Sequence, residues 1–191
     1  MKLPDSKRTL FTAAVLVTLS APFGAQAQMA PGPMSPGMAM PEAQPACAAV
    51  DKAMPAPWTG WTAPDPLKGG SVLATAGKLV VGHVYSAELP ASSVMTYVVP
   101  LPKPDAAGTF GGMFTLTVDK AGTYSIALSE GAWIDVAPAA GKVLTSVAHG
   151  HGPACTTIHK VVDFALQPGA YLIQVSGAPK SPVVISIQTK S

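Results

Sequence analysis

The residue types that could do chemistry gather in one short stretch, from His149 to His159, which reads HGHGPACTTIH. It holds three of the four histidines and one of the two cysteines of the chain. Imidazole nitrogens suit zinc, copper or iron, and a spacing of two places His149 and His151 on one side of an extended backbone. His149, His151 and His159 are therefore the candidate ligands of a transition metal, and otherwise they are solvated loop residues.

Cys47 and Cys155 are the only cysteines. An even number of cysteines in an oxidising compartment predicts a disulfide, here Cys47–Cys155. Closing so long a loop would stabilise the fold by about 4–5 kcal/mol in the chain-entropy description. Such a bond also removes the Cys155 thiolate from any metal site.

No motif for catalysis is present: the sequence lacks a Gly-x-Ser-x-Gly elbow, a His-Glu-x-x-His pair and a Walker loop. We therefore predict no catalytic residue. Trp58 and Trp61, on either side of Thr59-Gly60, are two large indoles that are costly to leave in water. They either cover part of the folded domain or form an aromatic platform for a sugar ring.

Residues 1–27 have the pattern of a secretory signal peptide. Lys2, Lys7 and Arg8 precede the apolar run Leu10–Leu19, and Ala25-Gln26-Ala27 resembles a cleavage site. We predict a periplasmic or secreted protein with no membrane span after the leader is removed. The remaining chain has nine lysines and nine acidic residues and no arginine, so it lacks the basic surface of a nucleic-acid binder.

Residues 28–66 are rich in Pro, Ala and Met and contain nine prolines. Such a composition buries little apolar surface, so we expect a largely disordered arm. Met29, Met34, Met38 and Met40 lie in this arm. Thioether sulfurs can bind Cu(I), but the same residues are also what low-complexity sequence of this composition contains.

Residues 67–191 are long enough for one hydrophobic core. Apolar residues recur there at every second position and Gly or Pro interrupts every window, which predicts short strands and no helix. The expected fold is all-β, a single antiparallel β-sandwich of jelly-roll-like form. The expected strands are 79–89, 94–99, 114–118, 124–128, 133–136, 143–147, 161–166, 171–175 and 183–187.

Two stretches repeat one pattern. In 114–129 and 162–176, three alternating apolar residues lead to a turn with a glycine, and a tyrosine two residues later resumes the apolar alternation up to a serine. We expect each stretch to be a hairpin in which the turn reverses the chain. The shared Gly-x-Tyr and closing serine favour a repeated structural element.

The block from Gly122 to Ser176 resembles a group of small exported bacterial proteins and, less closely, the pre-peptidase C-terminal (PPC) type of β-sandwich. The PPC resemblance implies an accessory or binding module without catalysis. Similar short chains carry the name homogentisate 1,2-dioxygenase, and His149-x-His151 resembles the His-x-His of those iron-dependent cupins. Where that family has its carboxylate ligand, this chain has Cys155.

We therefore expect an exported, non-catalytic binding or envelope-accessory module without a required cofactor. Its partner is a small molecule, a polysaccharide or an envelope protein. The alternative is a metal-binding protein, an iron oxygenase among others, that uses the His149/His151 loop with Zn, Cu or Fe.

Overall fold

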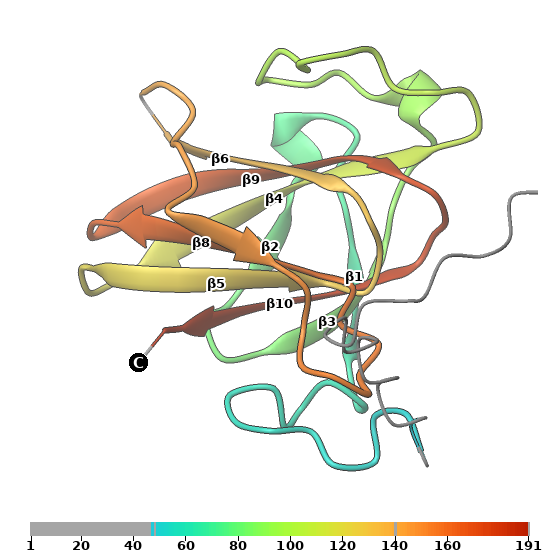
Figure 1. The fold of residues 1–191 in the computed structure, drawn as a ribbon. Helices are drawn as coiled ribbons and strands as arrows, with labels where there is room; N and C mark the ends of the chain where they lie inside the picture. The colour runs from blue at the N-terminus through green and yellow to red at the C-terminus, as the bar shows by residue number, and fades with distance from the viewer. Residues whose placement is uncertain (1–46, 48, 140, 191) are drawn as a thin grey trace, which may run out of the picture. The chain divides into compact units, whose positions relative to one another are not determined.

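The computed structural model describes residues 47, 49–139 and 141–190, which form two β-sheets packed face to face (Figure 1). The predicted signal peptide and the methionine-rich part of the arm lie outside these residues. The six-stranded sheet has the order β1 (Asp65–Lys68), β3 (Val84–Glu88), β10 (Val183–Thr189), β5 (Gly122–Leu128), β8 (Lys160–Leu166) and β7 (Ala148–Gly150). The four-stranded sheet has the order β2 (Gly77–Leu79), β4 (Phe110–Val118), β9 (Gly169–Ala178) and β6 (Trp133–Pro138).

One hydrophobic core fills the space between the sheets. Alternate side chains of each strand point inward, because successive residues of a strand face opposite sides. The largest fully buried ones include Phe114 and Leu116 from β4, Phe164 from β8 and Ile185 from β10. The predicted all-β sandwich is confirmed, and the only helical segments in the described residues are the 3₁₀ turns η1 (Leu73–Thr75) and η2 (Ser92–Val94).

The sheets are mixed rather than wholly antiparallel. β1 pairs with β3 in parallel, and β2 pairs with β4 in parallel. Strands β1 to β4 alternate between the two sheets. The parallel pairs follow if the chain reverses its direction each time it crosses from one sheet to the other. Two strands of one sheet that are separated by two such reversals point the same way, which makes these pairs parallel.

The two repeated stretches are not hairpins, so this prediction was wrong. β4 pairs with β9 and β5 pairs with β8, and the turns after Val118 and Leu166 carry the chain from one sheet to the other. Each stretch is thus an arch across the core. Apolar alternation shows which side of a strand is buried, but not which strand lies beside it.

The two arches pair with each other in a symmetric register. Val118 lies opposite Gly169 as Leu166 lies opposite Gly122, and Leu116 lies opposite Tyr171 as Phe164 lies opposite Tyr124. Each tyrosine hydroxyl donates a hydrogen bond to the carbonyl four residues earlier, Tyr124 to Lys120 and Tyr171 to Gln167, at 2.7 and 2.9 Å. The sequence repeat is therefore a repeat of structure.

Three expected strands differ from the observed ones. The stretch 79–89 is divided, because a turn at Val80–His83 takes the chain from β2 in one sheet to β3 in the other. The stretches 94–99 and 143–147 lie outside the strands and pack on the sandwich. They were predicted as strands because their apolar residues alternate as those of a strand do. β1 and β7 were not predicted, since they are short and mostly exposed.

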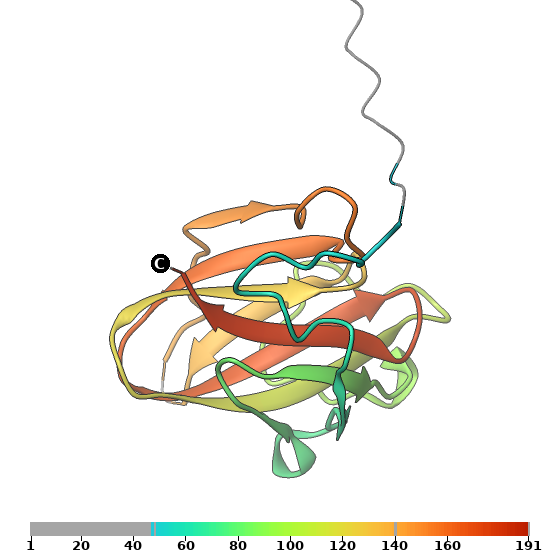
Figure 2. The same cartoon turned by 90° about the horizontal axis from the view of Figure 1, so that it is seen from below.

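Residues 49–64, here called the N-terminal strap, run across the outer face of the six-stranded sheet (Figure 2). Trp58 and Trp61 pack there on Val84, Ala127 and Ile158. The expected start of the sandwich at residue 67 falls within β1, which begins at Asp65.

The predicted disulfide is present, and it secures this strap. Cys47 is bonded to Cys155. Next to it, the Asp51 carboxylate accepts hydrogen bonds from the Thr157 backbone N–H and hydroxyl, at 2.7 and 2.5 Å. Trp61 Nε1 donates to the same hydroxyl at 2.9 Å.

Candidate functional site

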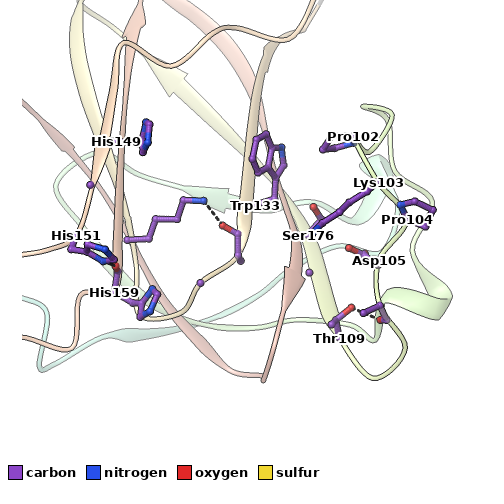
Figure 3. A pocket seen from close by; sticks show the side chains of 16 residues that line it. Pro102, Lys103, Pro104, Asp105, Thr109, Trp133, His149, His151, His159 and Ser176 are labelled. Carbon is purple, nitrogen blue, oxygen red and sulfur yellow. Dashed lines mark hydrogen bonds between the residues drawn. The ribbon is translucent and has the colours of Figure 1, made fainter. Parts of the chain in front are cut away.

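The three histidines of the predicted metal site lie on one wall of a cleft of about 510 Å³ (Figure 3). His149 is in the edge strand β7, and His151 and His159 lie at the two ends of the loop from β7 to β8. All three are exposed. His151 Nδ1 lies 2.9 Å from the His159 carbonyl oxygen, and the two rings meet edge to face with centroids 5.7 Å apart.

The remaining walls come from the other sheet and from a proline-rich loop. β6 contributes Trp133, β9 contributes Ser176, and the loop 102–109 contributes Lys103, Asp105 and Thr109. Figure 3 shows the histidines on one side of the cleft, the proline-rich loop on the other, and the Trp133 indole between them. The cleft therefore joins residues that are far apart in the sequence and belong to both sheets.

Trp133 is the largest apolar surface in the cleft. It is 51% exposed, whereas Trp58 and Trp61 are 7% and 2% exposed. Trp133 begins β6 and lies opposite Ser176 of β9, near the end of that strand pair. Its side chain points to the outer face of the four-stranded sheet, opposite to Ile134 in the core.

Lys160 lies next to this indole. Its Nζ donates a hydrogen bond to the Ala132 carbonyl at 2.7 Å and lies 5.5 Å from the centre of the Trp133 ring, within reach of a cation–π interaction. Burial lowers the pKa of the Lys160 ammonium below its ordinary value. No acidic side chain pairs with Lys160 among the residues that the structure describes.

Asp135 is a buried residue that holds the Trp133 indole by a hydrogen bond. It is 7% exposed, and its Oδ1 accepts a hydrogen bond from Trp133 Nε1 at 2.9 Å. Its Oδ2 is buried without a hydrogen-bond partner. Burial raises the pKa of the Asp135 carboxyl, and the bond from Trp133 partly opposes this increase.

The wall opposite the histidines is held by two polar anchors. Tyr97 donates a hydrogen bond to Asp105 Oδ2 at 2.6 Å. Gln174 is fully buried; its Oε1 accepts from the backbone N–H groups of Val98 and Val99, and its Nε2 donates to the Val99 carbonyl. The Gln174 bonds tie Val98 and Val99 to β9, and the Tyr97 bond ties Asp105 to the same segment, so this wall is held in place by the protein's own hydrogen bonds.

Among the described residues, no three His, Cys, Asp or Glu side chains are close enough together to hold a metal ion. Cys155 is bonded to Cys47 and offers no thiolate. The His149/His151/His159 set does share one cleft, but the donors do not form the two-histidine, one-carboxylate arrangement of an iron dioxygenase.

Trp58 and Trp61, the aromatic residues that the sequence offered as a platform, belong to the strap, are buried against the six-stranded sheet and lie with their rings edge to face. The exposed indole is Trp133, which the sequence analysis did not select. The sequence contains only a weak signal for this residue. Trp133 is the first residue of a short strand, and the side of the strand that it shares with Asp135 carries an acidic residue, as an exposed side can.

A second cavity of about 620 Å³ lies over the other end of the four-stranded sheet. Val98, Val143 and Leu73 are the exposed apolar residues of its lining, and Lys142 is its only charged residue. Its lining has the exposed polar side chains Thr115, Thr117 and Lys142 but offers no exposed aromatic ring. The Trp133 cleft is therefore the better candidate for a specific site.

Comparison of the chain with protein-family models gives no match, and neither does comparison with curated proteins. Among solved structures, the chain is similar to the pre-peptidase C-terminal domain of a collagenase from Bacillus anthracis. The TM-score is 0.36 at 13% sequence identity, over 58% of this chain and 91% of that chain. That structure is of the domain type that the block from Gly122 to Ser176 resembles in sequence.

Proposed function

We propose that this protein is an exported, non-catalytic binding module that holds a polysaccharide in the Trp133 cleft. The observation that carries the proposal is the exposure of Trp133, 51%, in a protein that buries its other two indoles. An indole half in water is a favourable surface for a ligand to cover, since aromatic side chains contribute large apolar areas to binding. Export rests on the predicted signal peptide and agrees with the Cys47–Cys155 disulfide.

The cleft has the composition of a carbohydrate site. A sugar ring presents a C–H face that packs on an aromatic ring and a rim of hydroxyls that need hydrogen-bond partners. The Trp133 ring supplies the first, and Thr109, Asp105 and the exposed histidines supply polar groups in the same cleft. A few polar groups around an apolar surface is the usual composition of a ligand site.

We propose a non-catalytic role because of the carboxylates in the cleft. Glycoside hydrolysis generally uses two carboxyl groups that flank the scissile bond. Asp105 is the one carboxylate among the residues that line the described cleft, and Tyr97 already donates to it. The arrangement can hold a sugar but lacks the second group that cleavage requires.

Binding of oligosaccharides to the mature protein, followed by isothermal titration calorimetry, tests the proposal. Trp133→Ala should abolish binding, and Trp133→Phe should retain part of it because a smaller aromatic face remains. Val147→Ala removes an apolar side chain that is also exposed but lies outside the lining of the cleft, and serves as the control. Equal affinities of the wild type and Trp133→Ala would rule out this cleft as the site.

Metal binding by His149, His151 and His159 is the second candidate, favoured by their position on one wall. Elemental analysis of protein purified without a His tag tests it. Stoichiometric Zn, Cu or Fe that is lost in the His149→Ala/His151→Ala double variant would support a metalloprotein, including the oxygenase alternative. If the purified protein contains no metal and binds oligosaccharide, the metalloprotein is excluded and the binding module is supported.

Among the described residues no helix combines the length and the apolar run that crossing a bilayer requires. On the separate ground of the signal-peptide pattern in residues 1–27, we propose that the protein is periplasmic or secreted.

A further inference from the structure

We propose that the ligand of the Trp133 cleft is an acidic polysaccharide, a chain that carries uronic acid residues, whose carboxylate is bound by Lys160. This inference rests on the proposed function and narrows its ligand class. It comes from the position of one unpaired cation beside the exposed indole.

Lys160 differs from the lysines that form ion pairs in the described structure. Lys180 is paired with Glu130 at 2.8 Å, and Lys190 is paired with Asp163. Lys160 has only the Ala132 carbonyl and the face of Trp133. A lysine ammonium has three N–H donors, so donors remain after the bond to Ala132.

The ammonium has already lost part of its water, and this favours an anion over a neutral ligand. Partial burial disfavours the charged form of a lysine, which is why the pKa of Lys160 is lowered. A carboxylate would compensate that loss with a charge-assisted hydrogen bond, about twice as strong as a neutral one. A neutral hydroxyl would compensate it less well.

The charges of the residues that line the cleft also favour an acidic ligand. The lining contains Lys103 and Lys160 against Asp105, whose carboxylate already accepts from Tyr97. Asp135, which accepts a hydrogen bond from the Trp133 N–H, is buried and is not among the residues that line the cleft. The wall that a ligand meets therefore has a positive balance.

The geometry suits a uronate more than a simple anion. The ammonium lies over the indole, 5.5 Å from the centre of the ring, so a carboxylate bound to Nζ would lie beside the exposed part of the ring. A uronic acid residue has an apolar C–H face and a carboxylate on the same ring. Inorganic phosphate or sulfate would reach Lys160 but leave the indole uncovered.

The test measures calorimetric affinity for oligogalacturonate, oligomannuronate and hyaluronan oligomers, and for oligogalacturonate whose carboxylates are methyl-esterified. The variant is Lys160→Met, which keeps an aliphatic stem beside Trp133 and removes the charge. Lys78→Met is the matched control, because Lys78 is exposed on β2 outside the cleft. Circular dichroism and the midpoint of thermal unfolding check that each variant is folded.

We expect the wild type to bind at least one acidic oligomer about tenfold or more tightly than its neutral counterpart, a difference of about 1.4 kcal/mol. Lys160→Met should lose that preference, and Lys78→Met should keep it. If the wild type binds the acidic and the esterified oligomers with equal affinity, and Trp133→Ala binds neither, the preference for an acidic ligand is overturned. The proposal of a polysaccharide-binding module would still stand. Failure of the wild type to bind any acidic or neutral oligosaccharide would overturn both.

Discussion

At the scale of single residues, the three indoles of this chain have different environments. Trp58 and Trp61 lie on the strap and are buried against the six-stranded sheet, and Trp133 is half exposed. Emission from an indole in water is shifted to longer wavelength, and soluble quenchers reach it.

Trp133→Phe should therefore shift the emission maximum to shorter wavelength and remove most of the fraction that iodide quenches. Trp61→Phe, measured in parallel, should leave that fraction in place. A quenchable fraction that survives in Trp133→Phe would mean that the strap leaves Trp58 or Trp61 open in solution.

Asp135 should give stability a pH dependence. Its pKa is raised by burial, so the folded state binds this proton more tightly than the unfolded state does. The contribution of Asp135 to stability is present at low pH and is lost as pH rises through the raised pKa.

Asp135→Asn keeps an acceptor for Trp133 Nε1 and removes the ionisation. Its free energy of unfolding relative to the wild type should become more favourable between about pH 3 and pH 7, measured by urea unfolding across that range. A difference between the two proteins that does not change with pH would contradict the burial of this carboxyl.

At the scale of elements, the two arches form the centre of the sandwich. Their tyrosines hold the two turns by equivalent bonds to the carbonyls of Lys120 and Gln167. The equivalence is incomplete, because the Tyr171 hydroxyl also accepts from the Gln167 backbone N–H at 2.9 Å.

Tyr124→Phe removes one hydrogen bond and should cost about 1 kcal/mol of unfolding free energy. Tyr171→Phe leaves both the N–H and the carbonyl of Gln167 without this partner and should cost more, about 2 kcal/mol. Chemical unfolding of the two variants measures both values. A larger loss in Tyr124→Phe would show that the turns are not held as the hydrogen bonds indicate.

At the scale of the whole molecule, the disulfide joins the strap to the loop that carries the histidines. Cys47 and Cys155 are 108 residues apart in the chain. A cross-link over so long a loop removes much freedom from the unfolded chain and is worth about 4–5 kcal/mol in the chain-entropy description.

The Cys47→Ser/Cys155→Ser double variant should therefore unfold at lower urea concentration, with a steeper slope because its unfolded chain is less compact, and its buried indoles should become more accessible to quencher. The wild type in dithiothreitol should behave in the same way. Unchanged stability in both would mean that the strap is held by Trp58, Trp61 and Asp51 without the bond.

Several features of this protein follow from the sequence alone. Apolar residues at every second position require pleated strands with one buried side, so the all-β sandwich could be predicted. Two cysteines with no other partner, in a chain with a predicted signal peptide, predict one bond, and Cys47–Cys155 is present. Matched spacing around Gly122 and Gly169 revealed the repeated element, since both the apolar pattern and the turn recur.

Only the tertiary structure decided how these parts are used. Alternation does not say which sheet a strand joins, so the arches and the parallel pairs could not be predicted. The exposure of an indole depends on which other segments pack against it. Trp58 and Trp61 are buried because the strap packs on the six-stranded sheet, while nothing in the described chain covers Trp133 to the same degree. The cleft exists because β6, β8 and the loop 102–109 meet in space, and sequence spacing carries no information about contacts between residues so far apart.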